Sequence, residues 1–139
     1  MHAIVAAALW LLLASGAPAA APKANCGDPQ SNLEMKICAS QDLTKAEAEL
    51  ARAFERALQA AKAQYDSVRR DAGFETMPNM PEELRKVERA WEAFRDANCG
   101  YQSLIYYGGT MAPLAVIGCR LDMTKARIKE LNDLADPGK

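Results

Sequence analysis

Apolar residues recur at steps of three and four positions along most of the chain beyond residue 30, which is the spacing of one face of an α-helix. Ser31 and Glu34 form the pattern of a capping box and predict a short helix through Leu33, Ile37 and Cys38. A long helix follows to about Ala72, and the charged residues between its apolar positions predict a solvent-facing side. Its apolar stripe consists of Leu43, Ala46, Leu50, Phe54, Ala57, Ala61, Tyr65 and Val68.

Two further helices follow the same spacing. Glycine and proline interrupt the pattern after the long helix, and Pro81 suits the first turn of a third one. This third helix is expected to end at the Gly108 and Gly109 pair, and its buried face to comprise Leu84, Val87, Trp91 and Phe94. A fourth helix begins between residues 110 and 113 and ends at Pro137, and its apolar positions are Leu114, Ile117, Leu121, Thr124, Ile128, Leu131 and Leu134.

The start of the chain has the pattern of a secretory signal peptide. An apolar run from Ala3 to Ala14 is followed by small residues, and Ala17-Pro18-Ala19 predicts cleavage after Ala19. The run is shorter than the roughly 20 apolar residues of a spanning helix, so we expect no membrane span in the mature chain. Residues 1–19 are therefore the expected signal peptide and residues 20–30 a leader segment, and the mature protein is expected to be periplasmic or secreted.

The cysteine count predicts two disulfides, because an even number in a short exported chain is typical of a stapled domain. Three connectivities are possible for four cysteines. Because residues that can reverse the chain lie within each local loop, we favour the pairs Cys26–Cys38 and Cys99–Cys119. No two cysteines have the close spacing of a structural zinc site, so we expect neither a metal nor another cofactor. The sequence thus predicts an all-α fold, a small antiparallel helical bundle stapled by two disulfides, over residues 31–136.

Charge and composition argue against several classes of function. Lys and Arg total 17 against 18 for Asp and Glu, and this balance argues against a nucleic-acid partner, since such binding depends on neutralised phosphates. The only histidine, His2, lies in the expected signal peptide, and paired cysteines leave no thiolate, so we expect no enzyme. Carboxylate pairs such as Glu82 with Glu83 could still act as acid and base, but the periodicity assigns them to solvent-facing sides.

A set of motifs covers nearly the whole mature chain. The most specific is the spacing that joins Trp91, Phe94, Arg95, Asp96 and Cys99. The others are Cys26, Met35–Ala39, Asp42–Leu50, Gly108–Pro113 and Cys119. In these motifs the chain resembles the LprI-type family of lysozyme inhibitors, which are small exported helical proteins. The resemblance implies a protein partner, which is a lysozyme for the named member of the family.

Two parts of the chain are candidates for partner binding. Arg95 could direct its guanidinium toward the acidic cleft of a lysozyme, or it could pair with an acidic group on the long helix and orient the bundle, which we favour. The connection between the last two helices offers aromatic side chains beside a glycine pair, and such loops often anchor recognition. Its tyrosines could equally cover the second disulfide. The candidate residues of this connection are Tyr106, Tyr107, Gly108, Gly109 and Met111.

The leading hypothesis from the sequence is an exported inhibitor that binds and occludes a cell-wall muramidase. Its basis is the signal-like start, the paired cysteines, the lack of a catalytic histidine and the family resemblance. The alternative is a non-catalytic envelope adaptor or structural protein that binds another protein through the same surface.

Overall fold

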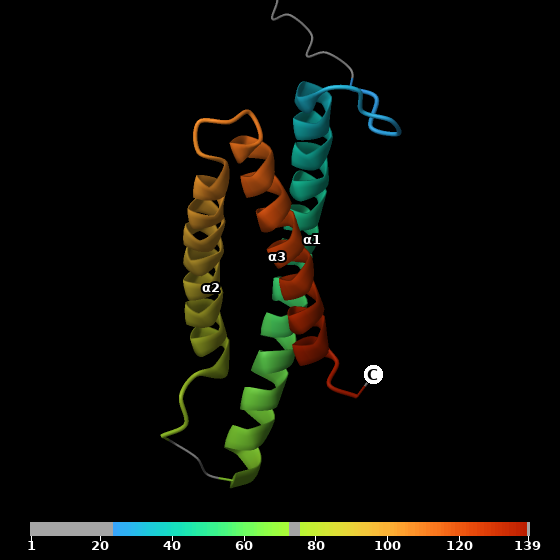
Figure 1. The fold of residues 1–139 in the computed structure, drawn as a ribbon. Helices are drawn as coiled ribbons and strands as arrows, with labels where there is room; N and C mark the ends of the chain where they lie inside the picture. Colours follow the sequence, from blue (N-terminus) through green and yellow to red (C-terminus); the bar gives the residue numbers. More distant parts are fainter. Residues whose placement is uncertain (1–23, 73–75, 139) are drawn as a thin grey trace, which may run out of the picture.

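The computed structural model describes residues 24–72 and 76–138, so the expected signal peptide, residues 1–19, and the first part of the leader lie outside the described residues. The described part is helical and contains no strand. It consists of α1 (Asn32–Ala72), α2 (Met80–Ser103), the short 3-10 helix η1 (Leu104–Tyr106) and α3 (Ala112–Ala135). Figure 1 shows that α1 and α3 run in the same direction and that α2 runs against both, which confirms the predicted antiparallel all-α bundle.

The helix α1 is one continuous helix of 41 residues, although the sequence predicted a short helix followed by a long one. Its start is as expected, because the Ser31 hydroxyl accepts a hydrogen bond from the backbone N–H of Glu34 at 3.2 Å. The separate short helix was wrong. The residues between Cys38 and Leu43 include neither glycine nor proline, so nothing there interrupts the backbone hydrogen bonds of the helix.

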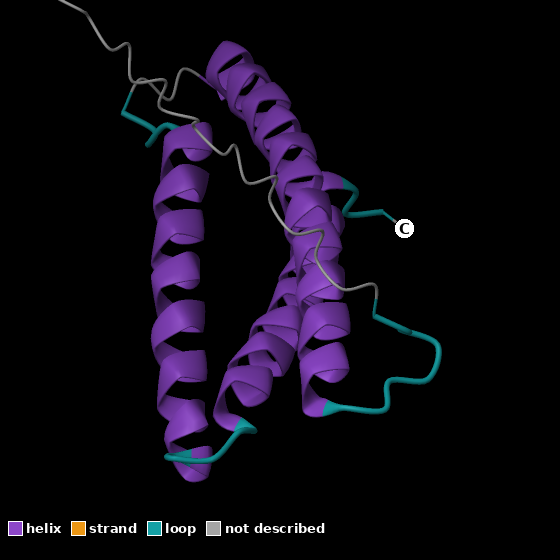
Figure 2. Ribbon diagram, turned by 90° about the horizontal axis from the view of Figure 1, so that it is seen from above, coloured by secondary structure: helices purple, strands orange, loops and turns teal. Residues whose placement is uncertain are grey.

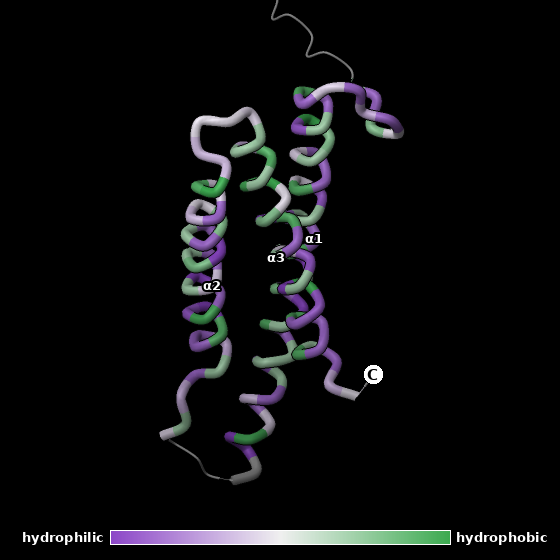
Figure 3. The backbone as a smooth tube through the Cα atoms, viewed as in Figure 1, coloured by the Kyte–Doolittle hydropathy of each residue, from purple (hydrophilic) through white to green (hydrophobic). Residues whose placement is uncertain are grey.

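The main core lies between α1 and α3, which share the most extensive contact of any two helices in the described residues. Alanine side chains on α1 allow α3 to approach closely, and the buried cluster comprises Ala46, Leu50, Ala53, Ala57, Ile128 and Leu131. Phe54, Leu84, Trp91 and Leu121 pack against this cluster. Figure 3 shows hydrophobic and hydrophilic stretches alternating along the helices, as expected when each has one buried side.

The start of α2 follows the sequence prediction in its proline. Its end does not, because α2 stops at Ser103 and the 3-10 helix η1 follows, before the Gly108 and Gly109 pair at which the sequence placed the end. The side-chain oxygen of Asn79 accepts a hydrogen bond from the backbone N–H of Glu82 at 3.1 Å, and Pro81 lies in the first turn. Proline has no backbone N–H to donate, so this position loses no hydrogen bond there. Figure 2 shows α2 apart from the α1–α3 pair, and its contacts with both are less extensive than theirs with each other.

The inward side of α2 differs from the predicted one. Glu88, Arg95 and Cys99 are buried on this side. Leu84 and Trp91 are partly buried there and pack against the core. Val87 and Phe94, which the sequence placed in the core, are instead 51% and 59% exposed. Both sets of residues follow steps of three and four, so periodicity alone could not separate them. Polar partners on α3 allow the charged side chains to take the inward positions.

Both predicted disulfides are present. Cys26 pairs with Cys38, at a Cα–Cα distance of 5.5 Å, and joins the segment before α1 to its second turn. Cys99 pairs with Cys119, at 5.6 Å, and joins the end of α2 to the first half of α3. In the chain-entropy model, closing loops of these lengths contributes about 3 kcal/mol each to stability. The second bridge therefore holds the two helices together next to their connection.

Candidate functional site

The last turn of α2 and its connection to α3 carry the densest group of exposed large apolar side chains in the described residues. We call these residues the connection patch, and they are Tyr101, Leu104, Ile105, Tyr106, Tyr107 and Met111. Tyr107 is the most exposed of them, at 87%. A monomeric protein seldom leaves so many adjacent large apolar residues in water, and such patches usually mark binding sites. All three of the predicted candidates with large side chains in this connection therefore lie at the surface.

Backbone hydrogen bonds and a glycine pair shape the connection. The backbone N–H of Tyr107 donates to the carbonyl of Leu104 at 3.1 Å, and that of Gly109 donates to the carbonyl of Tyr106 at 2.9 Å. Gly108 has a φ of +76°, a left-handed conformation that favours glycine. A Cβ atom at Gly109 would lie 3.2 Å from the Tyr106 carbonyl oxygen. The two glycines thus allow the tight turn that leaves the tyrosines at the end of the bundle.

Two links attach the connection to the rest of the bundle. The Asn32 side-chain amide at the start of α1 donates to the Thr110 hydroxyl at 3.2 Å. The Cys99–Cys119 disulfide bridges the two helices on either side. Figure 1 shows the connection and the start of α1 at the same end of the molecule. A surface held in this way loses less conformational entropy on binding than a free loop.

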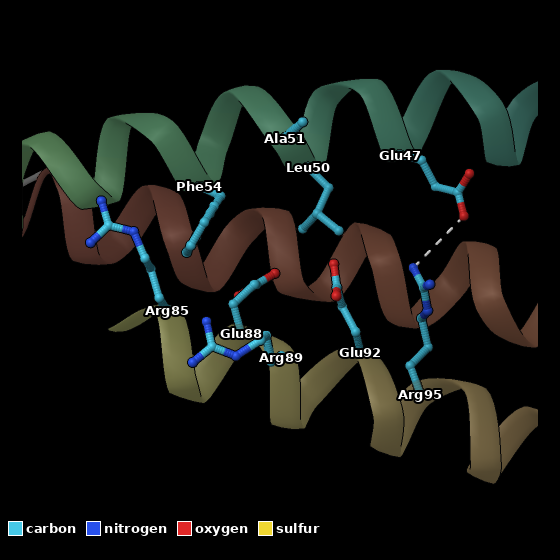
Figure 4. A pocket seen from close by; sticks show the side chains of 9 residues that line it. All are labelled: Glu47, Leu50, Ala51, Phe54, Arg85, Glu88, Arg89, Glu92 and Arg95. Carbon is cyan, nitrogen blue, oxygen red and sulfur yellow. Dashed lines mark ion pairs between the residues drawn. The ribbon is translucent and has the colours of Figure 1, made fainter. Parts of the chain in front are cut away.

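Arg95, the other predicted candidate, lies inside the bundle and is only 9% exposed. One of its terminal nitrogens donates to the Thr124 hydroxyl at 3.1 Å, and its Nε donates to Asp96 at 3.1 Å. The guanidinium also forms an ion pair with Glu47 of α1 at 3.9 Å, drawn as a dashed line in Figure 4. This is the pairing with the long helix that we favoured from the sequence. The observed geometry ties α2 to both neighbouring helices.

A second buried arginine, Arg127 of α3, also lies beside the Trp91 ring. Its Nε and one terminal nitrogen both donate to the same oxygen of Glu88, at 3.0 and 2.9 Å, and its other terminal nitrogen donates to Glu130 at 2.8 Å. Burial opposes the charge of Arg127, but the hydrogen bonds to Glu130 and Glu88 outweigh this effect and raise the pKa of the guanidinium. The Arg127 and Arg95 guanidinium carbons lie 5.7 and 5.2 Å from the centre of the Trp91 ring.

Sequence reasoning missed the Glu88–Arg127 pair. A signal for it exists, because Glu88 lies four residues after Leu84 and Arg127 lies three after Thr124, on the buried sides of their helices. The charges of Glu88 and Arg127 nevertheless predicted exposed positions, because charged side chains are rarely buried unless they are paired. The pairing joins residues 39 positions apart, a relation that the local pattern does not contain.

A groove of about 390 Å³ runs between α1 and α2 next to these charges (Figure 4). The α1 side supplies Leu50, Ala51 and Phe54, and the remaining lining is charged: Glu47, Arg85, Glu88, Arg89, Glu92 and Arg95. Three carboxylates therefore face three guanidinium groups, and the lining has no net charge. One oxygen of Glu88 is buried and accepts no hydrogen bond from any residue that the structure describes.

The carboxylate pair and possible metal ligands of the described residues were the remaining candidates for chemistry. Glu82 and Glu83, the carboxylate pair considered from the sequence, contact Arg85 and Lys86 of their own helix at 3.7 and 2.7 Å. Within residues 24–72 and 76–138, no group of three or more His, Cys, Asp or Glu side chains is placed to hold a metal ion. In the same residues, none of the helices combines the length and apolar character needed to cross a bilayer.

Comparison with known proteins adds two relationships. The sequence model of the family described as lysozyme inhibitor LprI matches residues 23–131, a range that includes all four cysteines. An uncharacterized protein of Rhizobium meliloti (strain 1021) is 35% identical to the chain over 136 residues, and the alignment covers 94% of each protein. No solved structure matches the chain.

Proposed function

The chain belongs to the LprI family of lysozyme inhibitors, and we propose that it is an exported, non-catalytic protein that binds a cell-wall muramidase and occludes its cleft. Two disulfides support an oxidising compartment, because such bonds persist mainly outside the cytosol. Together with the signal-like pattern of residues 1–19, they support a periplasmic or secreted location.

The connection patch is the observation that carries the binding part of this proposal. Exposed tyrosines are common anchors of protein interfaces, since they bury a large ring and keep a hydroxyl for hydrogen bonding. Muramidase clefts contain paired carboxylates and bind sugar rings. A Tyr106 or Tyr107 hydroxyl can donate to such a carboxylate, and its ring can cover the sugar-binding surface. The adjacent glycine pair lets the backbone approach the enzyme closely.

The groove between α1 and α2 fits this role less well. Its charges are already paired within the bundle at Glu47, Glu88 and Arg95, so they hold the helices together. An inhibitor that inserted Arg95 into an enzyme would have to break its bonds to Thr124 and Asp96 first. We therefore assign recognition to the connection patch and a supporting role to Arg95.

The test is inhibition of cell-wall lysis by the purified oxidised protein, measured with lysozymes of the c-type and of other types. The wild type is expected to slow lysis in a saturable way. Tyr107→Ala is expected to weaken inhibition at least tenfold, because truncating an aromatic anchor typically costs more than 1.4 kcal/mol of binding free energy. Tyr65→Ala is the matched control, since Tyr65 lies on α1 far from the connection in the chain, and it should leave inhibition unchanged.

Failure of the wild type to slow lysis at large molar excess rejects inhibition of the enzymes used. If Tyr107→Ala instead abolishes binding to a different envelope protein, the adaptor alternative holds. Turnover of cell-wall substrate by the protein itself, lost in a single carboxylate variant that still folds, would contradict the non-catalytic part of the proposal.

A further inference from the structure

The outward side of α2 carries an apolar stripe that no other described residue covers. We call it the outer stripe, and it consists of Val87, Ala90, Phe94, Ala97, Tyr101 and Leu104, all of them exposed. Successive members are separated by three and four residues in strict alternation. This repeat of three and a half residues is the spacing of the a and d positions of a coiled coil. A helix surface of this kind usually packs against another helix.

The packing of the bundle does not explain the outer stripe. The inward side of α2 contacts α1 and α3 through a different set of residues, among them Glu88, Trp91 and Arg95. A helix with one buried side normally turns polar residues outward, whereas α2 exposes these six apolar residues beside its charged ones. Gly100 flanks the stripe near the end of α2, and a Cβ atom there would meet nothing within 4 Å. Close packing within the bundle therefore gives no reason for a missing side chain at Gly100.

We propose that the outer stripe pairs with the outer stripe of a second copy of this chain, with the two α2 helices antiparallel. In an antiparallel pair, a positions of one helix face d positions of the other. One register places Phe94 against Ala97 of the second copy and Tyr101 against its Ala90. The same register places Val87 against Leu104 and Ala93 against Gly100. Each aromatic ring then meets a small residue, and the layers fill without voids.

The parallel arrangement lacks this complementarity. It would stack Phe94 on Phe94 and Tyr101 on Tyr101, with alanine on alanine between them. The layers with two aromatic rings would be overpacked and the layers with two alanines would leave cavities, and both overpacking and cavities reduce stability. The alternation of large and small residues along the stripe thus favours the antiparallel pair.

Charge also favours this register. The last turn of α2 has no basic residue, so the partial negative charge of its carbonyl end is not offset by a cation of the same helix. Antiparallel pairing brings Lys86 of the second copy beside this end. A cation there is favourable.

The apolar area is sufficient for a weak and specific dimer. A fully buried aromatic side chain covers about 150–250 Å², so the exposed parts of the stripe amount to roughly 500–600 Å² per copy. Two copies would bury about 1,000–1,200 Å² in total, near the lower limit for specific interfaces. Figure 1 shows no other described helix on the side of α2 that faces away from α1 and α3, so a second helix can reach that side. The antiparallel pair shares Tyr101 and Leu104 with the connection patches. It leaves the other patch residues of the two copies at opposite ends of the dimer, and these are Ile105, Tyr106, Tyr107 and Met111.

The first experiment measures the molar mass of the oxidised protein by sedimentation equilibrium over a wide concentration range, without a muramidase. The wild type is expected to form a reversible dimer. Ala97→Glu, which places a carboxylate against Phe94 of the second copy, is expected to weaken the dimer at least 100-fold. The control Ala126→Glu changes an exposed alanine of α3 and should leave the dimer unchanged. Circular dichroism confirms that both variants keep their helices.

The second experiment tests the register by disulfide formation. Chains carrying Ala90→Cys are mixed with chains carrying Tyr101→Cys, and the mixture is expected to form a mixed disulfide-linked dimer. Neither variant alone should form one, because identical positions are then eleven residues, or about 16 Å, apart along the antiparallel pair. Homodimers of Ala90→Cys would show a parallel pair and overturn the register. A wild type that remains monomeric at millimolar concentration overturns the proposal altogether.

Discussion

Each of the two sides of α2 departs in part from the composition expected of a helix on the surface of a small bundle. The inward side buries Glu88 and Arg95, whereas the outward side exposes Val87 and Phe94. The buried charges are tolerated because each has fixed partners: Arg127 for Glu88, and Thr124 with Glu47 for Arg95. The exposed apolar residues have no partner within the described chain. This difference separates residues that set the position of α2 from residues free to bind another molecule.

The largest effect is expected at the buried ion pair. Arg127→Ala leaves the Glu88 carboxylate buried without its cation and should lower the free energy of unfolding by about 3–5 kcal/mol. Urea denaturation measures the loss. Arg52→Ala, at an exposed arginine of α1, is the control and should change stability by less than about 0.5 kcal/mol. The double variant Glu88→Leu with Arg127→Met should recover most of the loss, because no charge then remains unpaired.

Comparing two aromatic residues on α2 tests the inward and outward sides directly. Trp91 packs against the core and lies beside two guanidinium groups, so Trp91→Ala should cost about 2–4 kcal/mol. Phe94→Ala, three positions further on, should cost less than about 0.5 kcal/mol. Both are measured by denaturation in the Ala97→Glu background, so that dimer formation does not contribute. Equal losses in the two variants would show that Phe94 packs within the bundle.

A smaller effect is expected where the buried hydroxyl of Thr124 accepts from Arg95. Thr124→Val keeps the shape of the side chain but leaves a donor of Arg95 unpaired, which should cost about 1–3 kcal/mol. Thr44→Val is the matched control, since the Thr44 hydroxyl is exposed and bonds only to the carbonyl of Ser40 in its own helix. A loss in the control equal to that in Thr124→Val would mean that the Arg95 contact adds nothing.

Much of the fold could be predicted from local features. The Ser31 cap and Pro81 in the first turn of α2 act over a few residues, and the structure confirms both. The expected end of α2 at the glycine pair was wrong, because the helix ends at Ser103. The disulfides could be predicted because short loops favour local pairing. The separate short helix expected through Cys38 was wrong, because no residue after it opposes a continuing helix. The side of α2 that faces the core was assigned only in part, since Leu84 and Trp91 face inward but Val87 does not.

The sequence by itself determined the helical class, the order of the three long helices, the two bridges and the apolar character of the connection, because each depends on residues close together in the chain. The tertiary structure alone decided which side of α2 is buried and which is free. That choice depends on whether a charge meets its partner, and the partners of Glu88 and Arg95 come from other helices. One helix can carry apolar residues at helical spacing on more than one side, so the spacing does not tell which side is buried. Only the packing of the helices against one another decides it.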